Sequence, residues 1–211
     1  MHPALIAIFS LIGAYLFWWL VGLRIMRKLH PRPIPWRWAR FINNPLRRRA
    51  QNPSKTLGQM GFREGMRVLE LGPGWGFLTL EAARRVGDSG RLYCLDIEPA
   101  LIARLKQKTA KVGLENVALV MGNGECLPFA SDSIDLAFLV AVLGEIPDKD
   151  AALKELNRVL CPGGVLSISE LLPDPDYPLR RTTIAWARKA GFEPFQEFGN
   201  FFAYTVNFRK G

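Results

Sequence analysis

The sequence predicts an α/β domain built on a doubly wound, mostly parallel sheet of seven strands, preceded by one transmembrane helix. Two observations predict this fold class. After Gly65, short runs rich in apolar and β-branched residues alternate with stretches whose apolar residues recur at helical spacing. Before the domain, 20 consecutive residues from Ala4 to Leu23 carry no charge, and a helix of that length spans about 30 Å of hydrocarbon.

The N-terminal segment, residues 1–28, is expected to be a membrane anchor. Trp18 and Trp19 lie near the end of the uncharged run and suit a membrane interface. Three basic residues follow it, namely Arg24, Arg27 and Lys28. By the positive-inside tendency they place the rest of a single-pass chain in the cytoplasm. A cleaved signal peptide and a buried core helix are the alternatives, and no basic residue precedes the run as a signal peptide would require.

Residues 29–53 form a basic segment rich in proline, tryptophan and arginine. Residues 1–63 hold 11 of the 28 lysines and arginines and no acidic residue, whereas the rest of the chain has the other 17 basic residues and all 19 acidic ones. Because the domain has no positive surplus, a nucleic-acid partner is not expected. Rings interleaved with arginines suit the lipid headgroup level, although the composition also fits a disordered basic linker.

From residue 54 to residue 211 the sequence predicts one domain. Five strands are expected at 67–71, 91–96, 117–121, 134–140 and 165–170, each a short apolar run. Helices are expected at 79–86, 100–112 and 150–160, the last stopped by Cys161-Pro162-Gly163-Gly164. A fourth helix at 179–190 and strands at 192–198 and 202–208 complete the domain. These last two strands are expected to form an antiparallel hairpin at the edge of the sheet.

The most informative motif follows the first strand. It reads Val68-Leu69-Glu70-Leu71-Gly72-Pro73-Gly74-Trp75-Gly76-Phe77. Glycines at alternate positions let the backbone approach a bound cofactor where side chains would collide. The dinucleotide-binding fingerprint requires glycine at the sixth place, where Phe77 stands. The loop is therefore Gly-x-Gly-x-Gly, and a purely structural turn is its alternative.

Two polar segments follow the next two strands. Asp96-Ile97 ends the second strand about 20 residues beyond the glycine loop, where a carboxylate can accept hydrogen bonds from ribose hydroxyls. The alternative for Asp96 is a helix N-cap. The third strand leads into Gly122-Asn123-Gly124-Glu125, followed by Leu127-Pro128-Phe129.

These motifs together resemble the class I S-adenosylmethionine-dependent methyltransferases, which have a Rossmann-like fold. The resemblance implies that S-adenosylmethionine is the cofactor and that Glu70 helps to hold its amino group. It also implies that Gly72, Gly74 and Gly76 pack beneath the methionine portion. Asp96 would bind the ribose and Ile97 would flank the adenine. The residues implied to read the adenine are Asn123, Gly124 and Glu125, of which the first two replace the usual Asp and Ala of the family.

The turn Leu160-Cys161-Pro162-Gly163-Gly164 resembles the Leu-Lys-Pro-Gly-Gly turn of the quinone-biosynthesis and related small-molecule methyltransferases. Those enzymes commonly carry a His-His pair where this chain has Gly144-Glu145. The change removes an imidazole base and brings a carboxylate to the mouth of the cofactor pocket. Glu145 is therefore the candidate for acceptor positioning or general-base catalysis, provided that burial raises its pKa. A solvated carboxylate or a helix cap is the alternative.

Several residues argue against other chemistries. Enzymes that methylate the amino groups of nucleic-acid bases usually bear Asp or Asn followed by Pro-Pro and an aromatic residue after the fourth strand. This chain has Leu139-Val140-Ala141-Val142 there. Both histidines, His2 and His30, lie outside the domain, and its three cysteines are widely spaced. Neither a metal site nor a disulfide is therefore expected.

The sequence thus predicts a membrane-anchored methyltransferase for a hydrophobic or membrane-resident acceptor of lipid, quinone or isoprenoid type. Displacement at a sulfonium needs mainly alignment and exclusion of water, so the lack of an obvious base is compatible with activity. The loop at 171–178, including Tyr177, is expected to shape the acceptor pocket. The alternatives are methylation of a small soluble thiol or amine and a non-catalytic, cofactor-binding membrane module.

Overall fold

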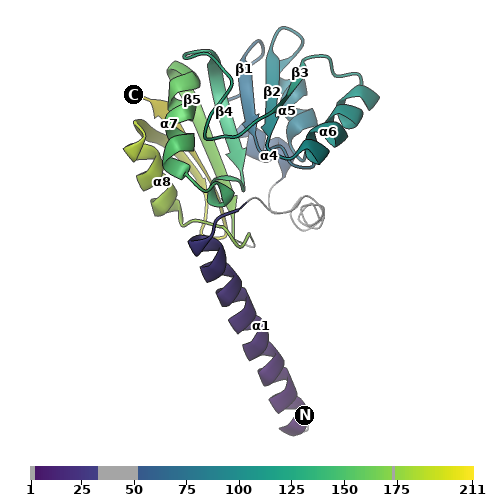
Figure 1. The fold of residues 1–211 in the computed structure, drawn as a ribbon, viewed down its shortest axis with the longest axis vertical. Coiled ribbons are helices and arrows are strands. Elements are labelled where there is room, and N and C mark those ends of the chain that lie inside the picture. The colour runs from purple at the N-terminus through teal and green to yellow at the C-terminus, as the bar shows by residue number, and fades with distance from the viewer. Residues whose placement is uncertain (1–2, 33–51, 173) are drawn as a thin grey trace.

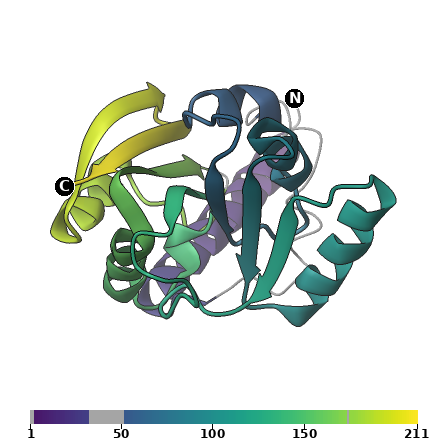
Figure 2. The same ribbon diagram turned by 90° about the horizontal axis from the view of Figure 1, so that it is seen from above.

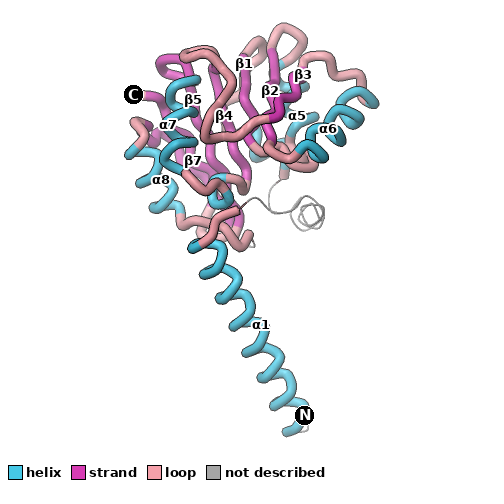
Figure 3. Tube along the Cα trace, in the orientation of Figure 1, coloured by secondary structure: helices cyan, strands magenta, loops and turns pink. Residues whose placement is uncertain are grey.

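The domain is built on one seven-stranded sheet with the order β3-β2-β1-β4-β5-β7-β6 (Figures 1 and 3). The computed structural model describes residues 3–32, 52–172 and 174–211. Strands β1 to β5 pair in parallel, whereas β7 pairs antiparallel with both β5 and β6. The expected doubly wound, mostly parallel sheet with an antiparallel hairpin at its edge is therefore confirmed.

The elements have the following bounds. The strands are β1 (Arg67–Leu71), β2 (Arg91–Asp96), β3 (Val117–Met121), β4 (Ile134–Val140), β5 (Leu160–Leu171), β6 (Phe192–Gly199) and β7 (Ala203–Lys210). The helices are α1 (Pro3–Leu29), α4 (Pro53–Gly58), α5 (Thr79–Val86), α6 (Pro99–Lys111), α7 (Lys149–Val159) and α8 (Arg180–Lys189), with a 3₁₀ turn η1 (Leu143–Glu145). The first four strands and α5 have the expected bounds, and α6, α7 and α8 differ from them by one residue at each end.

Strand β5 begins at Leu160, earlier than the expected start at residue 165. Leu160 pairs with Ile134, and the register then shifts before Leu136 pairs with Val165. The intervening Cys161-Pro162-Gly163-Gly164 is therefore an irregularity inside the strand and not a loop that ends the helix. A Cβ on Gly164 would lie 2.8 Å from the carbonyl oxygen of Cys161, so this bulge requires a glycine.

Two hydrophobic cores cover the two faces of the sheet, and helices flank it on both sides (Figure 2). Side chains alternate between these faces along each strand. On β1, Val68 joins the core formed with α4 and α5, whereas Leu69 joins the core formed with α7 and α8. On β4, Phe138 joins the core with α4 and α5, and Leu139 joins the core with α7 and α8. Burial on both faces explains why these strands are nearly continuous apolar runs.

The sheet places the glycine loop and the later motifs along one edge. Strands β1, β2, β3 and β4 are parallel, so the segments that follow them begin at the same edge. The strand order also reverses between β1 and β4. In open α/β sheets ligands bind at this reversal, outside the carboxyl ends of the strands.

Helix α1 projects from the domain as a single long helix (Figure 1). Its described side chains between Ile6 and Trp18 are exposed, which removes the alternative of a buried core helix. The transmembrane span expected over residues 1–28 is not supported. Judged on the described residues, none of the helices combines the length and apolarity that a bilayer crossing demands. Most of the basic segment expected at 29–53 lies outside the described residues.

Candidate functional site

The carboxyl ends of β1, β2 and β4 open into a cavity of about 310 Å³. This volume lies in the range of small-molecule sites, roughly 300–1,000 Å³. Nine of the ten residues expected to bind cofactor or to act in catalysis line it: Glu70, Gly72, Gly74, Asp96, Ile97, Asn123, Gly124, Glu125 and Glu145. Motifs far apart in the sequence therefore meet in one place.

The three glycines of the loop all have positive φ angles, but the space around them differs. A Cβ on Gly72 would lie 2.6 Å from Cγ2 of Val142, and one on Gly76 would lie 2.6 Å from Cδ1 of Leu105. A Cβ on Gly74 would meet no atom within 4 Å. Gly72 and Gly76 thus permit close packing, whereas Gly74 leaves space in the cavity for a ligand.

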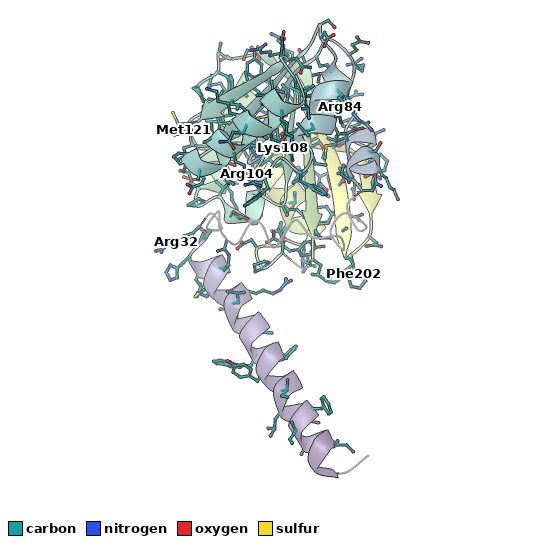
Figure 4. All side chains as sticks on the ribbon, turned by 90° about the vertical axis from the view of Figure 1, so that its right-hand side faces the viewer. Arg32, Arg84, Arg104, Lys108, Met121 and Phe202 are labelled. Atoms are coloured by element: carbon teal, nitrogen blue, oxygen red, sulfur yellow. The ribbon has the colours of Figure 1, made fainter. Side chains whose placement is uncertain are left out.

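Gly76 is the expected site residue that lies outside the lining of the cavity. Helix α6 holds the loop at this point. Lys108 Nζ donates hydrogen bonds to the carbonyl oxygens of Gly76, at 2.6 Å, and Trp75, at 3.1 Å. The guanidinium carbon of Arg104 lies 3.7 Å from the ring centroid of Trp75. Both cations lie on α6 (Figure 4), one turn apart, and the sequence analysis did not identify either.

Glu70 is a buried carboxyl group at the floor of the cavity. The hydroxyl of Thr79 donates a hydrogen bond to its Oε2 over 2.6 Å, and Cys94 Sγ lies 3.5 Å from the same oxygen. Burial raises the pKa of Glu70 to about 7, although the bond from Thr79 opposes this rise. A cationic ligand group placed beside the carboxyl would favour its charged form.

Asp96 joins the end of β2 to the glycine loop. Its Oδ2 accepts a hydrogen bond from the backbone N–H of Gly74 over 3.1 Å, and its Oδ1 accepts one from that of Glu98 over 3.0 Å. Burial raises the pKa of Asp96, and these two bonds oppose the rise. The N-cap position of α6 is Glu98, so the N-cap alternative for Asp96 is wrong. A carboxylate has about four lone-pair sites, which leaves acceptors for ligand hydroxyls.

Asn123 and Glu125 form a small polar turn after β3. Asn123 Oδ1 accepts from the backbone N–H of Glu125 at 3.0 Å, and its Nδ2 donates to Glu125 Oε2 at 3.2 Å. Glu125 Oε1 in turn accepts from the backbone N–H of Asp148 at 2.9 Å. These bonds connect the turn after β3 to the start of α7, and they fix the amide of Asn123, the group expected to recognise adenine.

Glu145 lies half-buried at the end of η1 and lines the cavity. Helix α7 is capped by Asp148, whose side chain accepts from the backbone N–H of Ala151 over 2.9 Å. The helix-cap alternative for Glu145 is therefore wrong. Nearby, Ala141 lines the cavity with a φ of 55°, a left-handed conformation that is costly for a residue with a Cβ.

The loop that follows β5 contributes Asp174 to the cavity and not Tyr177. Tyr177 is 4% exposed, and its hydroxyl donates to the carbonyl oxygen of Phe201 over 2.5 Å. Its ring packs edge-on against Tyr204 with centroids 5.6 Å apart. The expectation that this loop shapes the cavity is thus right for Asp174, whereas Tyr177 belongs to the core.

The cavity is strongly acidic. Its described lining residues include six carboxyl groups and neither a lysine nor an arginine: Glu70, Asp96, Glu98, Glu125, Glu145 and Asp174. Such a lining favours a cationic ligand, which fits the sulfonium and ammonium groups of the cofactor expected from the sequence. Within the part of the chain that the structure describes, no group of three or more His, Cys, Asp or Glu is arranged to hold a metal ion.

Comparisons with known proteins identify the family of the domain. A family model described as a methyltransferase domain matches residues 62–185. Over 116 residues the chain is 39% identical to the ubiquinone/menaquinone biosynthesis C-methyltransferases UbiE of Shewanella sp. (strain W3-18-1) and Shewanella oneidensis. The match covers 54% of this chain and 46% of each relative. The chain thus spans about half the length of these relatives.

Solved structures share the fold. A SAM-dependent methyltransferase from Aquifex aeolicus has a TM-score of 0.79 at 23% identity, over 85% of this chain and 100% of that one. The [4+2]-cyclase SpnF has a TM-score of 0.68 at 18% identity, over 76% and 80% of the two chains. Since one of these two proteins is a methyltransferase and the other a cyclase by name, the fold by itself does not specify the reaction.

Proposed function

Because the chain belongs to the methyltransferase domain family and carries an S-adenosylmethionine-dependent domain, we propose that it methylates a lipophilic small molecule, foremost a quinone-type ring. The observation that carries the proposal is the acidic cavity, which Glu70 and Asp96 line and in which a Cβ on Gly74 would meet no atom within 4 Å. The names of the relatives supply the acceptor class, since they act in quinone biosynthesis.

In this proposal the residues of the chain divide the work of binding. When bound, S-adenosylmethionine supplies a methyl group activated on a sulfonium. Glu70, which lines the cavity, would accept hydrogen bonds from the ammonium group, and Asp96 with Glu98 would accept them from the ribose hydroxyls. Bonds from Lys108 and to Asp96 hold the glycine loop before ligand arrives. A preformed loop lowers the cost of alignment, which dominates a direct displacement.

Glu145 is proposed to accept the proton that the acceptor loses. A ring hydroxyl that gives up its proton raises the electron density of a neighbouring ring carbon. That carbon would bond to the methyl group as the methyl–sulfur bond breaks and S-adenosylhomocysteine leaves. The ring carbon would then lose its own hydrogen as a proton and the oxygen would regain one, so that the aromatic ring is restored and one proton is released overall. Glu145 and Asp174 line the same cavity as Glu70 and Asp96, on segments that follow β4 and β5. The apolar part of the acceptor would lie against Val142 and Ile146, which also line the cavity. These residues exclude water, as the reaction requires.

A second acceptor class is favoured by the charge of the same wall. Two carboxyl groups, Glu145 and Asp174, face the acceptor side of the cavity, and carboxylates pair readily with an ammonium group. A small basic amine is therefore the alternative acceptor. It would be methylated in its neutral form after a carboxylate has accepted its proton.

The two acceptor classes can be separated with a labelled methyl group. The full chain would be incubated with methyl-labelled S-adenosylmethionine and either a demethylated hydroquinone with a short isoprenoid chain or a small secondary amine. The proposal expects label on the ring carbon of the hydroquinone, with kcat reduced about 100-fold in Glu145→Gln. The matched control Glu115→Gln, exposed and outside the cavity, should retain activity. Label on the amine alone would overturn the quinone assignment.

We also propose that α1 attaches the chain to a membrane surface. Large apolar side chains stand out from the helix, among them Phe9, Leu11, Phe17 and Trp18, which are 64–71% exposed. An exposed apolar surface of this kind commonly marks an interaction site. Surface attachment would raise the concentration of enzyme near a lipophilic acceptor. The cytoplasmic location of the domain stays a prediction from the sequence.

Vesicle binding tests this attachment. The full chain should sediment with vesicles of anionic phospholipid, and a variant carrying Phe9→Gln, Phe17→Gln and Trp18→Gln should remain in the supernatant. A matched variant with Phe201→Gln and Phe202→Gln, two exposed rings at the turn between β6 and β7, controls for loss of exposed aromatic surface. Equal sedimentation of all three proteins would contradict the role of α1.

A further inference from the structure

The last turns of α1 contact the loop that follows β5. Arg27 Nε lies 2.8 Å from Oδ1 and 2.7 Å from Oδ2 of Asp176, and its Nη2 completes an ion pair with the same carboxylate. One turn earlier, the guanidinium of Arg24 donates to the carbonyl oxygen of Leu172. The side chains of Arg27 and Asp176 are only 13% and 4% exposed. A pair so withdrawn from water is costly to break.

Asp176 is packed against the segment that carries Glu145. A Cβ on Gly144 would lie 2.2 Å from the carbonyl oxygen of Asp176 and 2.7 Å from its Cβ, so the two backbones are in direct contact. The backbone N–H of Asp176 also donates to Oδ1 of Asp174 over 2.8 Å. Asp176 therefore touches the immediate supports of both acceptor-side carboxyl groups of the cavity, Glu145 and Asp174.

The carboxyl groups around Arg27 give its contact with Asp176 an electrostatic role as well. The hydrogen bond with Asp176 is the main cause of the raised pKa of Arg27, and the charges of Glu145 and Asp174 add to it. Three carboxyl groups thus lie within electrostatic reach of one guanidinium. Without that cation the repulsion among them would weaken the packing of the loop against η1, although Lys149 also acts on Asp176.

We propose that Arg27 is a positioning residue that, through Asp176, holds the loop after β5 against η1 and thereby sets the acceptor side of the cavity. The N-terminal helix is then part of the acceptor site and not only an attachment. That this side of the cavity binds the methyl acceptor rests on the function proposed above. The coupling between α1 and the residues that line the cavity rests on the contacts alone. Gly144 is the consequence of this packing, because any side chain there would separate the two segments.

Amide hydrogen exchange on the full chain tests the coupling without any ligand. In Arg27→Met, exchange should become faster in residues 143–147 and 171–178 and stay unchanged in the glycine loop at 72–76. Arg181→Met, which removes an exposed arginine from α8, is the matched control and should match the unchanged protein throughout. Equal exchange in Arg27→Met and Arg181→Met would overturn the proposal.

Kinetics then separate positioning from a general loss of structure. With the demethylated hydroquinone as probe, Arg27→Met should raise KM about tenfold, while calorimetry should find the affinity for S-adenosylmethionine within about twofold. Arg27→Lys, which keeps the charge but loses the bidentate geometry, should recover part of the change. Equal losses in acceptor and cofactor binding would overturn the positioning role. If the unchanged protein does not methylate the probe, the quinone assignment fails, and hydrogen exchange still decides the coupling.

Discussion

At the scale of single residues, Gly74 and Gly61 offer a direct comparison. Both have left-handed backbones, with φ angles of 53° and 78°, and a Cβ on either would meet no atom within 4 Å. Only Gly74 lines the cavity. Gly74→Leu should therefore weaken S-adenosylmethionine binding by about 100-fold or more, as measured by calorimetry. Gly61→Leu carries the same backbone strain and should bind normally; equal losses in both would assign the effect to strain.

Glu70 should make cofactor binding depend on pH. Burial raises its pKa to about 7, so the carboxyl group is largely protonated at pH 6 and largely charged at pH 8. The cofactor ammonium pairs with the charged form, and the affinity should therefore rise about tenfold between these two pH values. Titrations across this range measure the effect. Glu70→Gln should bind more weakly and lose the pH dependence, and a Gln variant with the same slope would exclude Glu70 as its source.

The residues that the sequence could and could not identify differ in how they reach the cavity. Glu70 and Asp96 lie at the carboxyl ends of β1 and β2, and Gly74 lies in the loop directly after β1. Their positions in the sequence therefore predict where they lie in the fold. Asp174 enters the cavity from a loop whose path depends on contacts with Gly144 and α1. Lys108 acts through backbone carbonyls and carries no motif. Tertiary packing that no local pattern encodes decides such positions.

At the scale of elements, the strands were predictable where turn residues bound a buried apolar run. β1, β2 and β4 satisfy this condition, β3 is a half-buried apolar run, and the bounds of all four agree with expectation. β5 does not, because Cys161-Pro162-Gly163-Gly164 has the composition of a turn yet forms a bulge that still pairs at Leu160. Proline and glycine can mark a bulge within a strand as well as end an element. The pairing partner, and not the local composition, makes the difference.

The start of α7 depends on a cap that can be tested alone. The side chain of Asp148 accepts from the backbone N–H of Ala151, an N–H that the first turn of the helix leaves unpaired. Asp148→Ala should lower the free energy of unfolding by about 1 kcal/mol, as measured by urea denaturation. Asp88→Ala, in an exposed loop, is the control and should leave stability unchanged. If Asp148→Ala were as stable as Asp88→Ala and the unchanged protein, the cap would contribute nothing to the free energy of unfolding.

At the scale of the whole molecule, charge and shape divide the chain into two parts. The acidic cavity lies at the edge of the sheet where the strand order reverses, and the net positive charge comes from residues before residue 64, where no acidic residue occurs. The two parts meet where Arg24 and Arg27 contact the loop after β5. The domain was predictable because its motifs are local. The contact was not, because neither partner belongs to a motif.

This cavity should bind S-adenosylmethionine on the backbone of the glycine loop. Calorimetric titration of the full chain with S-adenosylmethionine tests it most directly. One saturable site per chain is predicted, since one cavity brings together Glu70, Gly74 and Asp96. Titration to millimolar cofactor with neither heat nor saturation would contradict the claim.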